Sequence, residues 1–318
     1  MGKIAFLFPG QGSQKVGMGQ AFYNETALAK EVFTQANATL GFDLAALCFE
    51  GPEETLKATE NAQVALYVTS LIAWKLFLDA SGVQPEACAG HSVGEYAALT
   101  AAGALPFEAG LQLVRTRGEL MRDAAKRTPG AMSALIGVSA EVARAICDEA
   151  RASGAGLVAV ANYNGGGQIV ISGEAGAVEK AGEIAKEQGA KRVIPLPVSG
   201  PFHSPLMVNA GDALFHSLSG VAFRKPQVPV IMNISAQYAE MPDDVVGGLT
   251  RQVSGSVRWE ESMQRLLADG FDTFIELGSG EVLCGLMRRI DKTARTFSVQ
   301  DPDSLASVIA QLKVEQEV

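Results

Sequence analysis

The chain alternates short apolar runs with longer segments in which apolar residues recur every three or four positions. The short runs predict buried β-strands and the longer segments predict amphipathic helices. This alternation favours an α/β fold with a mainly parallel sheet. We expect strands at 4–8, 86–90, 228–233 and 273–277, with one more before 302. We expect helices at 17–39, 62–80, 93–102, 107–127, 204–218, 242–253, 258–269 and 282–290, with a last helix from 302.

The order of elements changes between Pro129 and Pro197. There the pattern predicts strands at 131–138, 156–162, 168–173 and 192–196, with helices at 140–152 and 175–188. The order βαββαβ is that of the ferredoxin-like split unit, which forms a small sheet covered on one face. We therefore predict a small subdomain, residues 128–197, inserted into a large α/β domain formed by residues 1–127 and 198–318.

Composition narrows the class of protein. The 318 residues are 47% hydrophobic and 19% charged, which is typical of a globular protein with a substantial core. The net charge of −9 argues against a general nucleic-acid surface. The most apolar helix candidate, 64–78, is interrupted by polar residues and is too short to span a membrane. We expect no membrane and no nucleic acid.

The four cysteines, at 48, 88, 147 and 284, form no CxxC pair and have no partner histidines. They therefore predict no metal site. Since no signal peptide precedes the first strand, they also favour a reducing, cytoplasmic location.

The sequence Gly90-His-Ser-Val-Gly-Glu95 has the spacing of a nucleophile elbow. The expected strand before it and helix after it are the context that this motif requires. Ser92 would then lie at the tip of a sharp turn, under a helix N-terminus that favours developing negative charge. The alternative is a glycine-rich loop with an incidental serine.

A serine hydroxyl needs a base to become a good nucleophile, and the chain has three histidines. His91 precedes Ser92, so its ring should point away from the hydroxyl. His216 lies within a predicted helix, where a surface or core role is expected. His203 lies in the rigid loop 199–205 after the small subdomain, and we predict that it is the base.

Arg117 interrupts the apolar face of the helix predicted at 107–127. A buried guanidinium without a partner is costly, so it pairs either with an internal acid or with a ligand carboxylate. Its fork geometry suits a carboxylate. The residues alone leave both partners open.

The turn Pro9-Gly-Gln-Gly-Ser-Gln14 follows the first strand. It lacks the third glycine of a dinucleotide fingerprint, because position 15 is Lys15. A nucleotide site is therefore disfavoured. A turn that directs a backbone N–H at a neighbouring reactive centre, as part of an oxyanion hole, fits better.

The chain resembles the malonyl-coenzyme A:acyl-carrier-protein transacylase family almost from end to end. Seven motifs in the family's order carry the resemblance: Phe8–Gln14, Gly90–Tyr96, Arg115–Glu119, Asn162–Asn164 with Gln168, Pro201–Ser204, Gln252 near Arg258-Trp259, and Glu276–Gly280. The resemblance implies that the large domain is α/β-hydrolase-like.

The resemblance also implies a role for individual residues. Ser92 would be the nucleophile and His203 the base, with the backbone carbonyl of Gln252 holding the imidazole. The backbone N–H groups of Gln11 and Val93 would form the oxyanion hole. Arg117 would bind the free malonyl carboxylate, which favours a ligand as its partner. The remaining pocket residues implied are Met121, Asn162 and Gln168, and Phe202 before His203 matches the malonyl-using pattern.

The implied enzyme is a malonyl-CoA:acyl-carrier-protein S-malonyltransferase that supplies fatty acid synthesis. Malonyl-CoA acylates the serine, and the phosphopantetheine thiol of holo acyl carrier protein then removes the malonyl group. No cofactor is implied. Because the partner and this chain are both acidic, docking requires a local basic patch. Lys191 and Arg192 are candidates, and an ordinary solvated face is the alternative.

Three rival functions remain at this point. A serine esterase or thioesterase shares the elbow, but it predicts an acid partner for His203 and gives no reason for Arg117. The same transacylase chemistry could serve a polyketide synthase or malonate decarboxylase. A non-catalytic carrier-protein binding module would tolerate loss of Ser92 or His203, and both are present.

Overall fold

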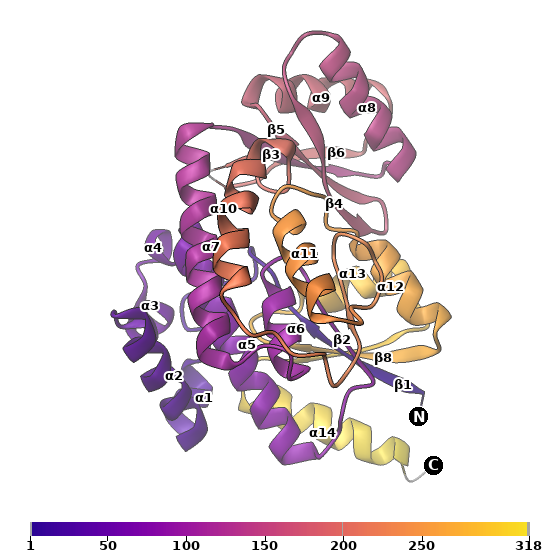
Figure 1. Cartoon of the computed structure of the whole chain (residues 1–318). Helices are drawn as coiled ribbons and strands as arrows, with labels where there is room; N and C mark the ends of the chain where they lie inside the picture. The colour runs from indigo at the N-terminus through magenta and orange to yellow at the C-terminus, as the bar shows by residue number, and fades with distance from the viewer. Residues whose placement is uncertain (1, 199, 317–318) are drawn as a thin grey trace.

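Five parallel strands form the main sheet of the molecule, and the computed structural model describes residues 2–198 and 200–316 around it. The strands lie in the order β7-β2-β1-β8-β9 (Figure 1). Their bounds are β1 (Lys3–Phe8), β2 (Ala87–Gly90), β7 (Val230–Ile231), β8 (Phe271–Leu277) and β9 (Arg295–Val299). Phe8 pairs with Gly90, so the loops that follow β1 and β2 leave the sheet side by side. The mainly parallel sheet expected from the sequence is confirmed.

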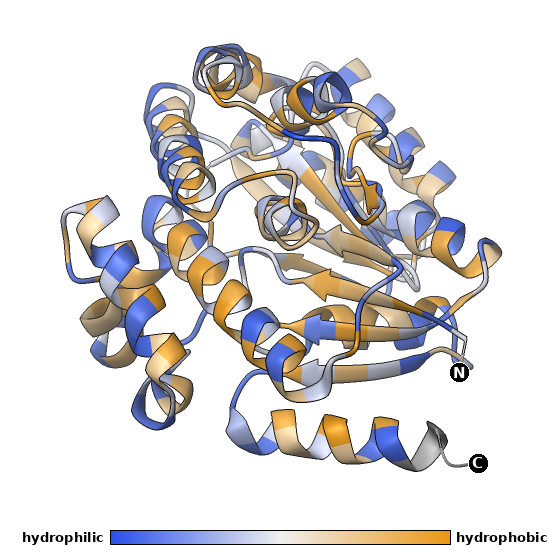
Figure 2. Ribbon diagram, turned by 60° about the horizontal axis from the view of Figure 1, so that its bottom comes forward, coloured by the Kyte–Doolittle hydropathy of each residue, from blue (hydrophilic) through white to orange (hydrophobic). Residues whose placement is uncertain are grey.

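Helices cover both faces of this sheet, as the alternation along β1 requires. Phe6 and Phe8 belong to one apolar core, together with side chains of α5, α6 and α7, whereas Ala5 and Leu7 belong to the core beneath α12 and α13. Figure 2 shows the strands mostly in apolar colours between these helices. The helices of this part are α1 (Gln20–Glu25), α2 (Ala27–Leu40), α3 (Leu44–Glu50), α4 (Glu53–Lys57), α5 (Thr59–Ser81), α6 (Gly94–Ala101), α7 (Phe107–Arg127), α10 (Val208–Ser219), α11 (Pro242–Gln252), α12 (Trp259–Ala268), α13 (Val282–Ile290) and α14 (Pro302–Gln316).

A second, antiparallel sheet lies at the top of Figure 1. Its strands are β3 (Ala131–Ile136), β4 (Val158–Gly165), β5 (Gln168–Gly173) and β6 (Arg192–Pro195), in the order β4-β5-β3-β6. Helices α8 (Ala140–Ala152) and α9 (Ala175–Glu187) bury a separate apolar core against it. The ferredoxin-like order is therefore confirmed, while the domain boundaries at 127/128 and 197/198 stay a prediction.

Strand β4 joins the two parts of the molecule. Val257, just before α12, donates its N–H to the carbonyl of Ala161 at 2.8 Å and accepts the N–H of Tyr163 at 2.9 Å. These bonds fix the small sheet against the large one through backbone groups. They also bring Asn162, which lies between the two bonded residues, to the edge of the site described below.

Several predicted bounds need correction. The helix expected at 17–39 is two helices, because the Thr26 side chain accepts the N–H of Ala29 and starts α2 anew. The strand expected at 228–233 is only two residues long in the structure. The helix expected at 204–218 opens with a short 3₁₀ turn, η1 (Pro205–Met207). Helices α3 and α4 were not predicted.

Helix α5 is longer than its expected 62–80, and its 23 residues are enough to cross a membrane by length and composition. Length therefore does not exclude a span, contrary to the sequence argument. However, 61% of its most apolar window is buried inside the protein, as in the core helix of a soluble fold. It is the only such helix within the described residues.

Candidate active site

Ser92 lies on a sharp turn between β2 and α6, with only 8% of its surface exposed. Its φ of 53° falls in the left-handed region, which strains a residue with a side chain. Both nearby glycines are required, because a side chain at either position would clash with the backbone. A Cβ at Gly90 would lie 2.0 Å from the backbone of Gly94, and a Cβ at Gly94 would lie 2.1 Å from the carbonyl oxygen of Phe8. The strand, turn and helix expected from the motif are present.

His203 reaches the serine from the loop before η1; Ser199, near the start of that loop, lies outside the described residues. Its Nε2 lies 2.8 Å from Ser92 Oγ, and its Nδ1 lies 2.8 Å from the backbone oxygen of Gln252. Because a carbonyl only accepts, Nδ1 carries the proton and Nε2 is free to accept. Burial and the nearby charge of Arg117 lower the pKa of His203 to about 3. The ring is therefore neutral and can act as a base.

Arg117 on α7 is buried beside the same hydroxyl, with 1% of its surface exposed. Its Nη2 donates to Ser92 Oγ at 3.1 Å and to Gln252 Oε1 at 2.9 Å, and its Nη1 donates to Gln63 Oε1 at 2.5 Å. Its Nε has no partner. Among residues 2–198 and 200–316, no carboxylate oxygen lies within 4.0 Å of this guanidinium. A buried, charged donor without an acid is what a ligand carboxylate would complete.

The two residues expected to form an oxyanion hole lie on adjoining loops. Gln11 is in the loop after β1, which packs so closely that a Cβ on Gly10 would lie 2.5 Å from the carbonyl oxygen of His91. Val93 follows Ser92 at the N-terminus of α6, where backbone N–H groups lack helical acceptors. The N–H of Ser92 itself donates to Asn233 Oδ1 at 2.7 Å. The use of the Gln11 and Val93 amides stays a prediction.

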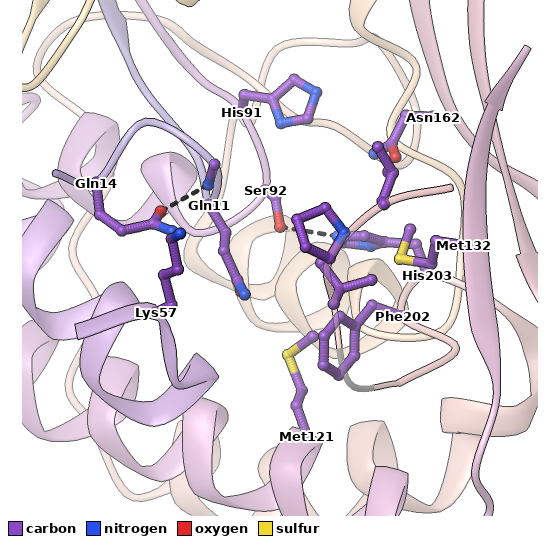
Figure 3. A pocket seen from close by; sticks show the side chains of 14 residues that line it. Gln11, Gln14, Lys57, His91, Ser92, Met121, Met132, Asn162, Phe202 and His203 are labelled. Atoms are coloured by element: carbon purple, nitrogen blue, oxygen red, sulfur yellow. Dashed lines mark hydrogen bonds between the residues drawn. The ribbon is translucent and has the colours of Figure 1, made fainter. Parts of the chain in front are cut away.

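A cavity of about 280 Å³ opens onto Ser92 (Figure 3). Met121 and Asn162 are in its wall, as expected. Its other lining residues come from five segments of the chain: Gln11, Gly12, Gln14, Lys57, His91, Ser92, Met132, Leu196, Pro197, Val198, Phe202 and His203. The cavity therefore lies between the two sheets, with Ser92 and His203 in its wall.

Gln168 does not line this cavity, so its placement in the pocket was wrong. Its Oε1 accepts a hydrogen bond from Arg289 at 2.7 Å, and it borders a different cavity, beside Gly137. The register explains the error. Gln168 pairs with Ile136, whereas Met132, at the opposite end of β3, faces the serine cavity.

The proposed docking patch lies at that same far end of the small sheet. Arg192 pairs with Ile136, and both Lys191 and Arg192 are exposed. The two side chains are available to a partner, but they stand away from the end of the sheet that borders the cavity.

Sequence reasoning missed three buried polar residues, Gln63, Glu95 and Asn233, which have 1%, 0% and 1% of their surface exposed. Each hydrogen-bonds to a predicted site residue: Gln63 to Arg117, Glu95 to Gln252, and Asn233 to Ser92. A polar residue within an otherwise apolar segment was the available signal. The ring of His91 is held by Asn164, with Nε2 2.9 Å from Oδ1, in agreement with its expected orientation away from the serine.

Metal ligands are not gathered in the described residues: no group of three or more His, Cys, Asp or Glu side chains could hold an ion there. The four cysteines are free and buried. Burial raises the pKa of the Cys88 thiol, which makes it inert at neutral pH.

Comparison with known proteins supports the resemblance to the transacylase family. Residues 5–316 match the acyl transferase domain family. The chain is 47% identical to the malonyl CoA-acyl carrier protein transacylase of Bacillus subtilis (strain 168), over 100% of this chain and 99% of the relative. It is 40% identical to the protein of that name from Escherichia coli (strain K12), over 97% and 99% of the two chains.

Solved structures of malonyltransferases have the same fold as this chain. The acyl-carrier-protein S-malonyltransferase of Burkholderia pseudomallei 1710b superposes with a TM-score of 0.93 at 42% identity, covering 97% of this chain and 99% of that chain. A malonyl-transacylase solved in complex with a type II PKS acyl-carrier protein gives a TM-score of 0.94 at 38% identity, covering 97% and 99%. The chain therefore belongs to the acyl transferase domain family, which includes the malonyl CoA-acyl carrier protein transacylases.

Proposed function

We propose that this protein transfers the malonyl group of malonyl-CoA to the phosphopantetheine thiol of holo acyl carrier protein through a malonyl-Ser92 intermediate. One observation carries the proposal. Ser92 Oγ lies within hydrogen-bonding distance of both a neutral imidazole and a guanidinium that no acid of the described residues contacts directly. The first group activates the hydroxyl, and the second selects an acyl group that bears a carboxylate.

The first half-reaction acylates the serine. His203 Nε2 takes the hydroxyl proton as Oγ attacks the thioester carbonyl carbon. The backbone N–H groups of Gln11 and Val93 stabilise the negative oxygen of the tetrahedral intermediate. The carbon–sulfur bond then breaks, and the proton held by His203 passes to the departing coenzyme A thiolate.

The second half-reaction reverses these steps with a new thiol. His203 removes the proton of the phosphopantetheine thiol, whose sulfur attacks the malonyl-serine ester. The carbon–oxygen bond to Ser92 breaks, and the proton returns to Oγ. Throughout, Arg117, whose Nη2 lies 3.1 Å from Ser92 Oγ, binds the malonyl carboxylate and fixes the acyl group near the hydroxyl. The chemistry uses no metal and no bound cofactor.

Two acceptors fit this mechanism. The acyl carrier protein of fatty acid synthesis is the acceptor that we propose, because the relatives are named for transfer to an acyl carrier protein. A polyketide carrier protein is the second candidate, because one similar structure is a complex with such a carrier. We infer a cytoplasmic reaction in which Lys191 and Arg192 attract the acidic carrier protein.

The test compares acceptors. Purified enzyme with malonyl-CoA should load holo carrier protein much faster than it releases malonate to water, measured by chromatography of the carrier protein and of free malonate. Apo carrier protein, which lacks the thiol, is the matched control. Rapid malonate release without carrier loading would identify a thioesterase instead.

A further inference from the structure

Glu95 is a buried acid for which the mechanism has no use so far. It lies in the first turn of α6, and its surface is 0% exposed. Its Oε1 accepts the backbone N–H of Asn233 at 2.5 Å, and its Oε2 accepts from Gln252 Nε2 at 2.5 Å. Both partners are neutral. Burying an acid in this way is costly, and both of its oxygens are used as acceptors of N–H groups.

The side-chain amide of Gln252 stands between Glu95 and Arg117. The amide oxygen accepts from Arg117 Nη2 at 2.9 Å, while the amide nitrogen donates to Glu95 Oε2. The same nitrogen also donates to the backbone oxygen of Ser92 at 2.9 Å. Arg117 and Glu95 are therefore linked by two hydrogen bonds through one amide, without direct contact.

The relay fixes the orientation of the amide. A guanidinium only donates and a carboxylate only accepts, so the Gln252 oxygen must face Arg117 and its nitrogen must face Glu95. Turning the amide over would oppose donor to donor and acceptor to acceptor. The carboxyl group of Glu95 and the Ser92 carbonyl thus together determine which atom of Gln252 meets Arg117, and the bond that results holds the guanidinium beside Ser92 Oγ.

We propose that Glu95 is a positioning residue that acts through Gln252 to hold Arg117 for the malonyl carboxylate. This role rests on the proposed function, because it concerns the same guanidinium. A relayed acid has an advantage over one in direct contact. It anchors the guanidinium through Nη2 while no acid contacts it directly in the described residues. Burial raises the pKa of Glu95 to about 8, while the hydrogen bonds from Asn233 and Gln252 and the charge of Arg117 act in the opposite direction.

Glu95→Gln tests the proposal with almost no change of shape. Asn233 N–H and Gln252 Nε2 are both donors, and the new amide can accept from only one of them. If it keeps the backbone N–H, Gln252 must turn and present its nitrogen to Arg117. We expect the ratio of kcat/KM for malonyl-CoA to that for acetyl-CoA to fall about 10- to 100-fold, the effect of losing one hydrogen bond to a charged group.

A matched control is Glu276→Gln. Glu276 is equally buried and accepts the N–H of Cys284 at 2.8 Å, and it bonds to none of the site residues. It should leave the malonyl-to-acetyl ratio unchanged. In an Arg117→Ala background, Glu95→Gln should change the ratio less than about twofold, because the group on which it acts is gone.

An unchanged ratio in folded Glu95→Gln protein, or a full further loss in the Arg117→Ala background, would overturn the role. If Glu95→Gln does not fold, Gln252→Met removes the amide while keeping the carbonyl that holds His203. Its ratio should fall similarly, and an unchanged ratio there overturns the relay. If Arg117→Ala itself keeps the malonyl preference, the assignment of Arg117 fails first and the role of Glu95 falls with it.

Discussion

Arg117→Ala is the substitution whose effect follows most directly from the geometry. It removes a guanidinium that is 1% exposed and that, among the described residues, is contacted directly by no acid and has an Nε without a hydrogen-bond partner. Removing one member of a buried, hydrogen-bonded charge pair costs about 2–5 kcal/mol. If the malonyl carboxylate is the other member, kcat/KM for malonyl-CoA should fall about 30- to 5,000-fold.

Acetyl-CoA separates recognition from chemistry in this experiment. An acetyl group has no carboxylate, so its kcat/KM should change less than about tenfold, and the preference for malonyl should be lost. Steady-state transfer to holo carrier protein, followed by chromatography, measures both substrates. Arg115→Ala is the control on the same helix, because Arg115 pairs with Glu119 instead of pointing into the site. Equal losses for both substrates, or a retained malonyl preference, would refute the reasoning.

Two further predictions concern the base and the carrier protein. Because the pKa of His203 is lowered to about 3, acylation of the wild-type enzyme should keep its rate as the pH falls from 7 to 5. Arg117→Ala removes a positive charge that disfavours the imidazolium, so it should move the acid limb of acetyl transfer to higher pH. A wild-type midpoint between 6 and 7 in a pH profile of kcat/KM would contradict this pKa. Replacing Lys191 and Arg192 together by Glu should raise the KM for carrier protein and leave that for malonyl-CoA unchanged, and an unaltered carrier KM would discard this docking patch.

Local patterns were sufficient to predict the elbow and most of the fold. The apolar runs before Ser92 and the glycines around it specify strand, turn and helix through sterics that act within a few residues. The ferredoxin-like order also followed from the alternation of elements between Pro129 and Pro197. Thr26 was missed as a helix boundary because its capping bond competes with a continuous amphipathic pattern.

The buried polar partners of the site were beyond sequence reasoning from periodicity. Asn233 and Glu95 are 138 residues apart, and only the pairing of β2 with β7 brings them together. The prediction that Gln168 lines the serine cavity failed for a similar reason. A motif gives its position along the chain, whereas the register of β5 on β3 decides which end of the sheet it occupies.

The central claim is that Ser92 carries the malonyl group. Mass spectrometry of the intact protein mixed with malonyl-CoA measures this directly, followed by mapping of the peptide that contains Ser92. We predict a single malonyl adduct on Ser92, absent in Ser92→Ala and removed by holo carrier protein. An unmodified wild-type protein, or an adduct on another residue, would contradict the account.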